Sequence, residues 1–471
     1  MPDHRQKNSY RDHAGWRYFQ SGLNQQRSSR RKRRIGRRLC ALALLIWVAC
    51  WGLKTLMGNN GVSGRSDAVQ SSSAATNKLI SGRDDVRKLL DRRFGDNLTR
   101  KSLEMQIGQQ TLQIETSLDE DLQNYLLDHM DRKNSRDIGI VVMEADTGRV
   151  LAMAGFDRTG SGNPCLRSTF PAASIFKIVT AASAVDHCNY SADSTLHFNG
   201  YKHTLYKRQI TEKVNKYTNT VTFKDAFAQS INPVFGKIGE LHLGKSVLEK
   251  YAETFSFNDA LTFDLSLQPS HFQISDDPYN WAEVASGFNR DTTISPLHGA
   301  VMASAVLNKG RLVAPYLVDR IVDAQGNLLY RGEQRQVQQA MSEKASGVLS
   351  QLMQTTIKSG TARKSFRGWR KDKVLSQLQI GGKTGSMDNK THDVRYDWFV
   401  GFARGLGGRA NLTVAVMVAH QKYIGIRASQ YARMAISHYF RRLFDANKEK
   451  HAARETTDTG TARLEYRTSS T

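Results

Sequence analysis

Strand-like runs lie at both ends of the folding part of this chain, with a mostly helix-like stretch between them. Residues Ile138 to Phe156 form two β-rich runs around Asp146-Thr147-Gly148, which is a hairpin signal. Two further apolar runs, Trp398 to Ala403 and Leu412 to His420, are separated by a glycine-rich turn. This order predicts an antiparallel sheet that is closed by both ends of the domain and carries an inserted helical region.

Polar segments set the expected limits of the domain. Gly58 to Thr76 is rich in Gly, Ser, Asn and Ala and is typical of a flexible linker. Asn77 to Gln109 spaces its apolar residues among many charges, which favours one or two amphipathic helices. Arg427 to Phe444 has helical spacing and predicts a terminal helix. We therefore expect a linker with short juxtamembrane helices at 58–110, a folded domain at 111–444 and a disordered tail at 445–471.

Positive charge is concentrated before the one long apolar run. The formal net charge of the 471 residues is +23, and residues 1–38 hold twelve Lys or Arg against two Asp. The densest stretch, Arg30 to Arg38, suits nucleic acid or anionic lipid. Leu39 to Leu53 follows without a charge, and it extends to Met57 if Lys54 snorkels. That is close to the roughly 20 residues a transmembrane helix needs.

This arrangement predicts a single transmembrane anchor at 39–57, with residues 1–38 as a basic cytoplasmic tail. The remaining chain would then lie outside the cytoplasm. A cleaved signal peptide is the alternative, but the basic tail is long for one and the cleavage pattern after Met57 is weak. We expect the tail to set topology and contact anionic lipid. No DNA-binding fold motif accompanies it, so no nucleic-acid partner is expected.

The four cysteines divide between the span and the external part. Cys40 and Cys50 lie in the predicted span as small apolar residues. Cys165 and Cys188 lie in the external part, where disulfides persist. They could form a disulfide or stay as two buried thiols, and the sequence leaves both open. Two isolated cysteines do not make a four-ligand zinc site, and no metal is expected.

The first chemical motif is Ser174-Ile175-Phe176-Lys177, followed by an apolar, helix-compatible stretch. Ser174 then lies near a helix N-terminus, and Lys177 lies one turn away on the same face. A lysine with a lowered pKa in a dry cleft can serve as the base that activates a serine. The helix terminus favours developing negative charge. Alone the pattern is weak, because a helix cap with an exposed lysine has the same letters.

Two more short motifs follow. Ser230-Ile231-Asn232 precedes Pro233, which indicates a loop between two helices; by itself it could be a simple Asn-Pro turn. Lys383-Thr384-Gly385-Ser386 leads into strand-like sequence, so alternation puts Lys383 and Gly385 on one face. A phosphate-binding Gly-Lys-Thr loop is disfavoured, because Gln377 stands where that loop needs its first glycine.

Together and in this order, the motifs form the Ser-x-x-Lys, Ser-x-Asn, Lys-Thr-Gly set of penicillin-recognising serine enzymes. On these residues the chain resembles a penicillin-binding protein transpeptidase over about residues 111–444. TLQIETSLDEDLQ, SGTAR (Ser359 to Arg363) and WFVGFA also look similar to family segments. The resemblance implies an α+β sandwich, with an antiparallel five-stranded sheet flanked by helices and an inserted all-helical subdomain. A single transmembrane helix would precede it.

The resemblance also assigns catalytic roles. Ser174 would attack the carbonyl between the two terminal D-alanines of a peptidoglycan stem peptide, and Lys177 would take its proton. Ser230 would relay a proton to the departing D-alanine, with Lys383 tuning it electrostatically. Asn232 would hold the substrate amide. Covalent catalysis of this kind needs no metal or cofactor.

The third motif would bind the substrate. Thr384 and Ser386 would hold the terminal carboxylate, while Gly385 leaves room for the ligand backbone. The oxyanion hole would be the backbone N–H groups of Ser174 and Ser386. Ser386 stands where threonine is frequent in the family, and it keeps the hydroxyl.

The expected function is a peptidoglycan D,D-transpeptidase that is acylated by β-lactams. Its partners would be D-Ala-D-Ala stem peptides, the membrane and a glycosyltransferase, and its place the periplasmic side of a bacterial inner membrane. With no room for a glycosyltransferase domain between Met57 and Thr111, we expect a compact monofunctional, class B-like member. A D,D-carboxypeptidase or β-lactamase on the same scaffold is one alternative, although Asn232 argues against a class D β-lactamase. A non-enzymatic β-lactam sensor or scaffold is another.

Overall fold

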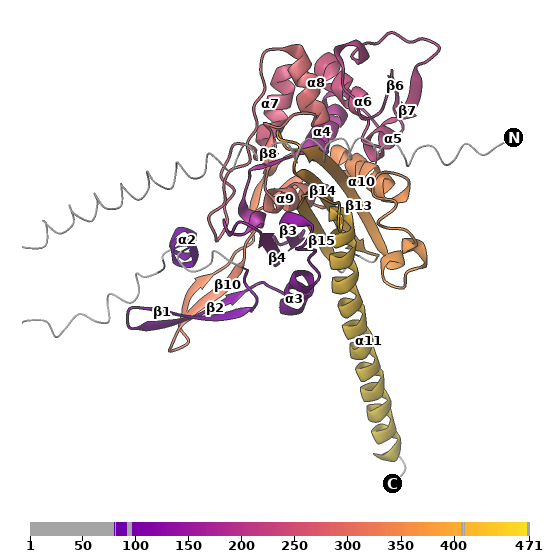
Figure 1. The fold of residues 1–471 in the computed structure, drawn as a ribbon. Coiled ribbons are helices and arrows are strands. Elements are labelled where there is room, and N and C mark those ends of the chain that lie inside the picture. The colour runs from indigo at the N-terminus through magenta and orange to yellow at the C-terminus, as the bar shows by residue number, and fades with distance from the viewer. Residues whose placement is uncertain (1–79, 81, 92–96, 407, 409, 469–471) are drawn as a thin grey trace, which may run out of the picture. The chain divides into compact units, whose positions relative to one another are not determined.

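The structure is a computed structural model that describes residues 80, 82–91, 97–406, 408 and 410–468 (Figure 1). The predicted basic tail, the predicted anchor at 39–57 and the linker up to Thr76 lie outside the described residues. Among the helices of the described part, none is both long enough and apolar enough to span a membrane. The placement of the anchor therefore stays a prediction.

One five-stranded antiparallel sheet forms the centre, in the order β13-β14-β15-β3-β4 (Figure 1). Its strands come from both ends of the domain, as the sequence pattern predicts. The early hairpin turns at Gly148, which has a φ of 82°. Glycine adopts this left-handed conformation without the strain that a side chain would bring. The strand bounds are Ser135–Glu144 (β3), Val150–Asp157 (β4), Leu378–Asp388 (β13), Arg395–Gly405 (β14) and Asn411–His420 (β15).

Helices cover both faces of this sheet, so its central strands are apolar at nearly every position. On one face, α9 (Pro296–Leu307) packs against β15 and α10 (Glu343–Lys358) packs against β13. The other face is covered by α3 (Glu120–Asp128) and α11 (Ala428–Thr468). In β14, Phe399 packs in the second core and Val400 in the first, which is the alternation a strand requires.

The terminal helix is longer than expected. The structure gives α11 as Ala428–Thr468, so the helix continues through residues that were expected to form a disordered tail from Asp445. This corrects the expectation for the described part of the tail. The sequence offers a reason, because Asn447 to Glu455 is rich in Ala, Glu, Lys and Arg, which are strong helix formers.

The inserted region is mainly helical. Its helices are α4 (Lys177–Cys188), α5 (Phe223–Ala228), α6 (Asn232–Lys237), α7 (Gly244–Thr254) and α8 (Pro278–Ser286). The expectation of an all-helical insert is wrong, because β6 (Thr195–Phe198) and β7 (Asn219–Thr222) form a two-stranded ribbon within it. Their Thr and Val residues favour extended backbone. Two more short pairs join β5 (Phe170–Pro171) to β8 (Thr293–Ile294) and β9 (Arg311–Val313) to β12 (Gln336–Gln339).

A second antiparallel sheet, in the order β1-β2-β10-β11, was not predicted. Its strands are Ser102–Ile107 (β1), Gln110–Thr116 (β2), Val318–Asp323 (β10) and Leu328–Arg331 (β11). The strands of the folded domain therefore begin at Ser102, earlier than the domain start that was expected near Thr111. The helix α2 (Arg83–Asp91) fits the expected amphipathic helix. It contacts the body through Arg83, whose Nε lies 3.1 Å from the buried Asp264 carboxylate.

Cys165 and Cys188 are both free thiols in the structure, which corrects the possible disulfide between them. Their surroundings differ. The Sγ of Cys165 is buried and lies 3.4 Å from the carbonyl oxygen of Ala154. The Sγ of Cys188 lies 3.9 Å from the backbone carbonyl oxygen of His242. Burial raises the pKa of both thiols, so they are small apolar side chains rather than reactive thiolates.

Candidate active site

Ser174 lies in a short 3-10 turn, Ala173–Phe176, that leads directly into α4. The turn is strained, because Ala173 has a φ of 49°. Gly287 packs against it so closely that a Cβ there would lie 1.9 Å from the carbonyl oxygen of Ala173. Gly287 also has a positive φ of 64°. This glycine therefore lets α8 and its following loop support the backbone of the predicted nucleophile.

Lys177 is fully buried beneath Ser174. Its Nζ lies 2.9 Å from the Oγ of Ser174 and 2.8 Å from the Oδ1 of Asn232, and it also donates to the carbonyl of Ser286. Burial, together with the charge of Lys383, holds the pKa of Lys177 well below its usual range. A neutral amine has two N–H groups and one lone pair. The Oδ1 of Asn232 and the carbonyl oxygen of Ser286 can only accept hydrogen bonds, so they take the two N–H groups. The lone pair is then left for the hydroxyl of Ser174.

Ser230 and Asn232 lie at the junction of α5 and α6, as the Asn-Pro sequence predicts. Ser230 takes the left-handed conformation with a φ of 56°, and Asn232 is the first residue of α6. The backbone N–H of Asn232 donates to the carbonyl of Lys202 at 2.7 Å, and its Nδ2 donates to the carbonyl of His203 at 3.2 Å. These contacts fix the amide so that Oδ1 faces Lys177.

Lys383 is the second buried amine of the site. Its Nζ donates to the Oγ of Ser230 at 3.0 Å and to the carbonyl of Thr384 at 2.8 Å. Burial lowers the pKa of Lys383 to about 7. Each predicted catalytic serine therefore has its own lysine, and the three motifs meet in one place although up to 209 residues of sequence separate them.

Residues 383–386 alternate along β13 as the sequence predicts. Gly385 faces the turn of Ser174, because a Cβ there would lie 3.2 Å from the Cγ1 of Ile175. On the other side, the Oγ1 atoms of Thr384 and Thr361 lie 2.5 Å apart, and Ser386 accepts from the Nε of Arg395 at 3.0 Å. Since β13 is at the edge of its sheet, an extended peptide can pair with its outer side.

Four residues beside the site were not predicted as site residues: Thr361, Arg395, His203 and Gly287. Thr361 lies within the SGTAR segment, which was noted only for its family likeness. His203 lies beside Ser230, and partial desolvation together with the charges of Lys177 and Lys383 lowers its pKa. Arg395 and Gly287 had no signal in the sequence, because their roles depend on packing between distant segments.

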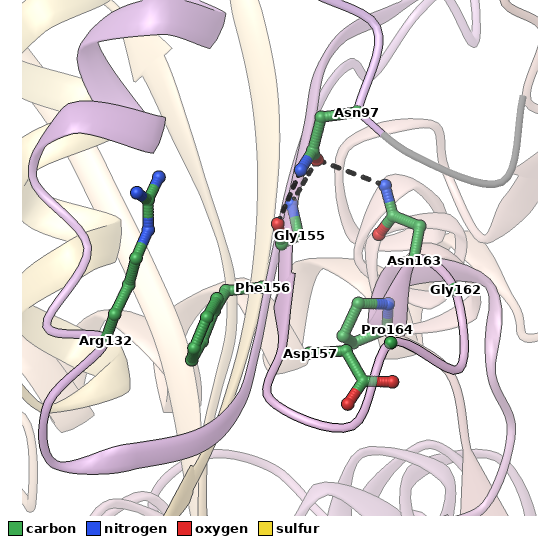
Figure 2. A pocket seen from close by; sticks show the side chains of 9 residues that line it. Asn97, Arg132, Gly155, Phe156, Asp157, Gly162, Asn163 and Pro164 are labelled. Atoms are coloured by element: carbon green, nitrogen blue, oxygen red, sulfur yellow. Dashed lines mark hydrogen bonds between the residues drawn. The ribbon is translucent and has the colours of Figure 1, made fainter.

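A separate pocket of about 280 Å³ lies along β4, at the opposite edge of the sheet from β13 (Figure 2). Asn97 closes one side of it by pairing with both backbone groups of Gly155, each at 2.6 Å. The guanidinium of Arg132 lies 5.9 Å from the ring centroid of Phe156. This amide pairing caps the edge strand. The pocket contains none of the predicted catalytic residues, so it is distinct from the candidate active site.

Comparison with known families decides how the site should be understood. The family model of the penicillin binding protein transpeptidase domain matches residues 138–438, which contain all three motifs. The chain belongs to the penicillin-binding protein transpeptidase family.

Curated relatives are distant and longer. The chain is 26% identical to Stage V sporulation protein D of Bacillus subtilis, over 50% of this chain and 36% of that protein. Its identity to peptidoglycan D,D-transpeptidase PbpA of Mycobacterium tuberculosis is 23%, over 59% of this chain and 61% of the relative. The chain thus spans less than two thirds of the length of these relatives.

Solved structures show the same fold. The D,D-transpeptidase domain of a peptidoglycan glycosyltransferase from Eggerthella lenta has a TM-score of 0.57 at 22% identity, covering 74% of this chain and 85% of that one. PBPA of Mycobacterium tuberculosis has a TM-score of 0.56 at 20% identity, covering 69% and 81%. At such low identity the likeness concerns the fold alone.

Proposed function

We propose that this protein is a peptidoglycan D,D-transpeptidase that works through an acyl-enzyme on Ser174. The observation that carries the proposal is the pairing of two buried lysines with two serines. Lys177 lies 2.9 Å from the Oγ of Ser174, and Lys383 lies 3.0 Å from the Oγ of Ser230. Burial lowers the pKa of both amines, so one of them can act as a base near neutral pH.

Acylation begins when the Oγ of Ser174 attacks the carbonyl carbon of the penultimate D-alanine. Its proton passes to the lone pair of Lys177, which the carbonyl of Ser286 and the Oδ1 of Asn232 hold in place. The backbone N–H groups of Ser174 and Ser386 would stabilise the oxyanion, a kind of contact typically worth on the order of 3 kcal/mol. Lys177 needs no neighbouring carboxylate, because desolvation already favours its neutral form.

Departure of the terminal D-alanine requires a proton on its nitrogen. The hydroxyl of Ser230 can donate that proton as the C–N bond breaks, and it is restored by the proton that Lys177 took from Ser174, so that Lys177 is neutral again in the acyl-enzyme. The positive charge of Lys383, at 3.0 Å from the Ser230 oxygen, stabilises the negative charge that develops there. The released carboxylate end is held at β13 by the hydroxyls of Thr384 and Ser386. The Arg395 guanidinium, which donates to Ser386, adds positive charge at that place.

Deacylation completes the reaction when an amine from a neighbouring strand attacks the ester of Ser174 and forms an amide cross-link. The C–O bond to Ser174 breaks, and the proton that the amine gives to Lys177 returns to the Oγ of Ser174. A β-lactam would acylate the same serine, because its strained amide occupies the place of the D-Ala-D-Ala bond. An acyl-enzyme complex of PBPA from Mycobacterium tuberculosis with imipenem has been described, which supports this part of the proposal. Attack by water instead would make the protein a carboxypeptidase.

We also propose that residues 39–57 anchor the chain in a bacterial inner membrane, with the site on the periplasmic side. The support for this is the uncharged run after Arg30 to Arg38. A glycosyltransferase partner stays a prediction from the family resemblance.

Mass spectrometry of muropeptides tests the reaction directly. Full-length protein is incubated with D-Ala-ended peptidoglycan strands, and the digested products are separated by mass. A cross-linked dimer that forms with wild type and not with Ser174→Ala is the expected result. Trimmed monomer peptides without dimers would indicate a carboxypeptidase. Unchanged peptides with active substrate would contradict an enzymatic role.

A further inference from the structure

Two basic segments border the candidate active site. Residues 199–217 connect β6 to β7, and residues 358–373 begin at the end of α10 and lead towards β13. We call these two segments together the basic collar. They are far apart in the sequence, and each contributes exposed cations that the proposed chemistry does not use.

The second segment of the collar is the more strongly charged. It holds seven exposed cations and a single acid, Asp372, which already pairs with Arg433 of α11 at 3.7 Å. Arg370 also lies over the ring of Trp369, 5.4 Å from its centroid. The seven cations are Lys358, Arg363, Lys364, Arg367, Arg370, Lys371 and Lys373.

The first segment adds exposed cations and aromatic rings. Its one acid, Glu212, is engaged by Lys237 at 3.1 Å. Three tyrosines stand out from the surface, with exposed fractions of 81% for Tyr201, 51% for Tyr206 and 75% for Tyr217. The cations of this segment are Lys202, Lys207, Arg208, Lys213 and Lys216.

Both segments contact the short stretch of chain that carries Ser230 and Asn232. The N–H of Thr361 donates to the carbonyl of Ala228 at 3.0 Å. From the other segment, the Nζ of Lys202 donates to the side chain of Gln229. The backbone carbonyl of Lys202 accepts from the N–H of Asn232. The collar is therefore continuous with the rim of the site, and its two parts meet the same five residues, 228–232.

The first segment is held in a fixed conformation. The buried side chain of Gln209 donates to the carbonyl of Asn199 at 2.8 Å and accepts from the N–H of Tyr206 at 2.9 Å. The hydroxyl of Tyr279 donates to the carbonyl of Leu205 at 2.9 Å. With its backbone fixed from inside, the segment presents its lysines and tyrosines outward.

The collar cations lack acidic partners within the described part of the chain. None of the twelve lies within 4.0 Å of a carboxylate among those residues, although several exposed cations elsewhere do, such as Arg320 with Glu115 at 2.6 Å. Like charges in such density repel one another, and they raise the local concentration of any polyanion. A surface of this kind at the rim of a site is suited to a polyanionic substrate.

We propose that the basic collar binds the carboxylate-bearing peptides of a peptidoglycan strand and so holds the polymer across the mouth of the site. This deepens the proposed function and rests on it. Every stem peptide that ends in D-Ala carries a carboxylate, so a strand presents one negative charge or more at each repeat. The exposed tyrosines supply flat, rigid rings for the sugar faces. Only the peptide end needs to reach Ser174, and the remainder of the strand lies on the collar.

The test compares two charge-neutralising variants of the full-length chain in mild detergent. The collar variant carries Lys358→Gln, Lys364→Gln, Arg367→Gln and Arg370→Gln. The control variant removes the same charge from four exposed cations outside the collar. Its substitutions are Lys101→Gln, Lys133→Gln, Arg331→Gln and Lys422→Gln.

Both variants are made in a Ser174→Ala background, so that acyl transfer contributes nothing to the binding signal. Cosedimentation with purified sacculi should be about tenfold weaker for the collar variant than for the control, and the difference should shrink as salt is raised. Sacculi whose carboxylates have been amidated should bind both variants equally. The circular dichroism spectrum and the Tm of each variant show that the fold is kept.

Equal binding of the two variants to untreated sacculi would overturn the proposal. So would a loss by the collar variant that appears only with micelles containing phosphatidylglycerol, since the surface would then face lipid. A difference that persists on amidated sacculi would also contradict it. Because penicillin labelling of the Ser174 protein is measured separately, a failure of the proposed reaction remains distinguishable from a failure of the collar.

Discussion

Lys177 and Lys383 are two amines with no exposed surface, and each lies beside a serine, Lys177 beside Ser174 and Lys383 beside Ser230. Burying an ammonium group is costly, and each amine avoids part of that cost by releasing its proton at a lower pH. Burial of the lysine lowers the stability of the fold, but it also lowers the pKa of the amine and so allows the lysine to act as a base. This trade between stability and chemistry can be measured at both residues.

The stability of the protein should rise with pH above neutrality. The pKa of Lys383 is lowered to about 7 from 10.5, so between these values the unfolded chain binds more protons than the folded chain. The free energy of unfolding then increases by up to about 1.4 kcal/mol per pH unit from this group. Urea unfolding at pH 7, 8 and 9 would measure it. Lys383→Met should make the rise less steep by the contribution of this group, with that of Lys177 remaining, and an equally steep rise in that variant would refute this origin.

Acylation by a fluorescent penicillin should require neutral Lys177. The rate should fall on acidification through the lowered pKa of this residue, because a protonated amine cannot take the Ser174 proton. Lys177→Ala should lose on the order of 10² to 10⁴ in rate. Lys422→Ala, which changes an exposed lysine, serves as the control and should label like wild type. A Lys177→Ala variant that keeps its fold and labels at the wild-type rate would exclude this residue as the base.

The element that completes the site is the edge strand β13, which packs its glycine-containing motif against the turn of Ser174. Ile175 packs closely against Gly385, since a Cβ at residue 385 would lie 3.2 Å from the Cγ1 of Ile175. A side chain at residue 385 would therefore require the turn of Ser174 to move away from the strand, by a few tenths of an ångström for a Cβ alone and by more for a branched side chain.

Gly385→Val should therefore push β13 away from Ser174. We expect penicillin labelling to slow by at least about tenfold while the circular dichroism spectrum is kept, because a misplacement of about 1 Å can cost 10²-fold. Gln379→Val, in the same strand but outside the motif, is the matched control and should label normally. Normal labelling of Gly385→Val would show that the close contact does not matter.

Sequence reasoning predicted the elements whose apolar pattern is long and regular. The hairpin at Ile138 to Phe156 and the strand with WFVGFA lie in the central sheet as expected. The missed strand β1 reads SLEMQI, six residues with charged and polar positions between the apolar ones. Those letters also suit an amphipathic helix. Its pairing with β2 and the pairing of β2 with β10, some 200 residues away, decide the outcome, and no local pattern contains that information.

The residues of the candidate site likewise fall into those that the sequence predicted and those that it did not. Ser174, Lys177, Ser230, Asn232 and Lys383 were found because short motifs carry them. The structure joins Lys177 to Ser174 and Asn232, and Lys383 to Ser230, by hydrogen bonds. Thr361 contacts Thr384 only because the loop after α10 wraps back to β13. Contacts of that kind come from the three-dimensional path of the chain, which spacing within a motif does not reveal.

At the scale of the whole described body, α2 is attached through a buried ion pair. The Nε of Arg83 lies 3.1 Å from Asp264, whose other oxygen accepts from the N–H groups of Leu317 and Val318 at 2.6 and 2.9 Å. Burial raises the pKa of Asp264 despite these partners. The pair therefore joins the first described helix to the loop between α7 and α8, and this loop also binds the start of β10.

Arg83→Met should lower the free energy of unfolding by about 3 kcal/mol, because it leaves the carboxylate of Asp264 buried without its cation. Lys88→Met, at an exposed position of the same helix, should change it by less than about 0.5 kcal/mol. Urea unfolding of both variants compares them. Equal stability of the two would mean that α2 contributes nothing to the fold through this contact.

The most direct test of the central claim is mass spectrometry of the full-length protein after exposure to penicillin. We predict an increase by the mass of one penicillin in wild type and in Ser161→Ala, with the adduct on the peptide that contains Ser174. Ser174→Ala should remain unmodified while keeping its fold. An adduct that persists in Ser174→Ala, or that maps to another residue in wild type, would contradict the account.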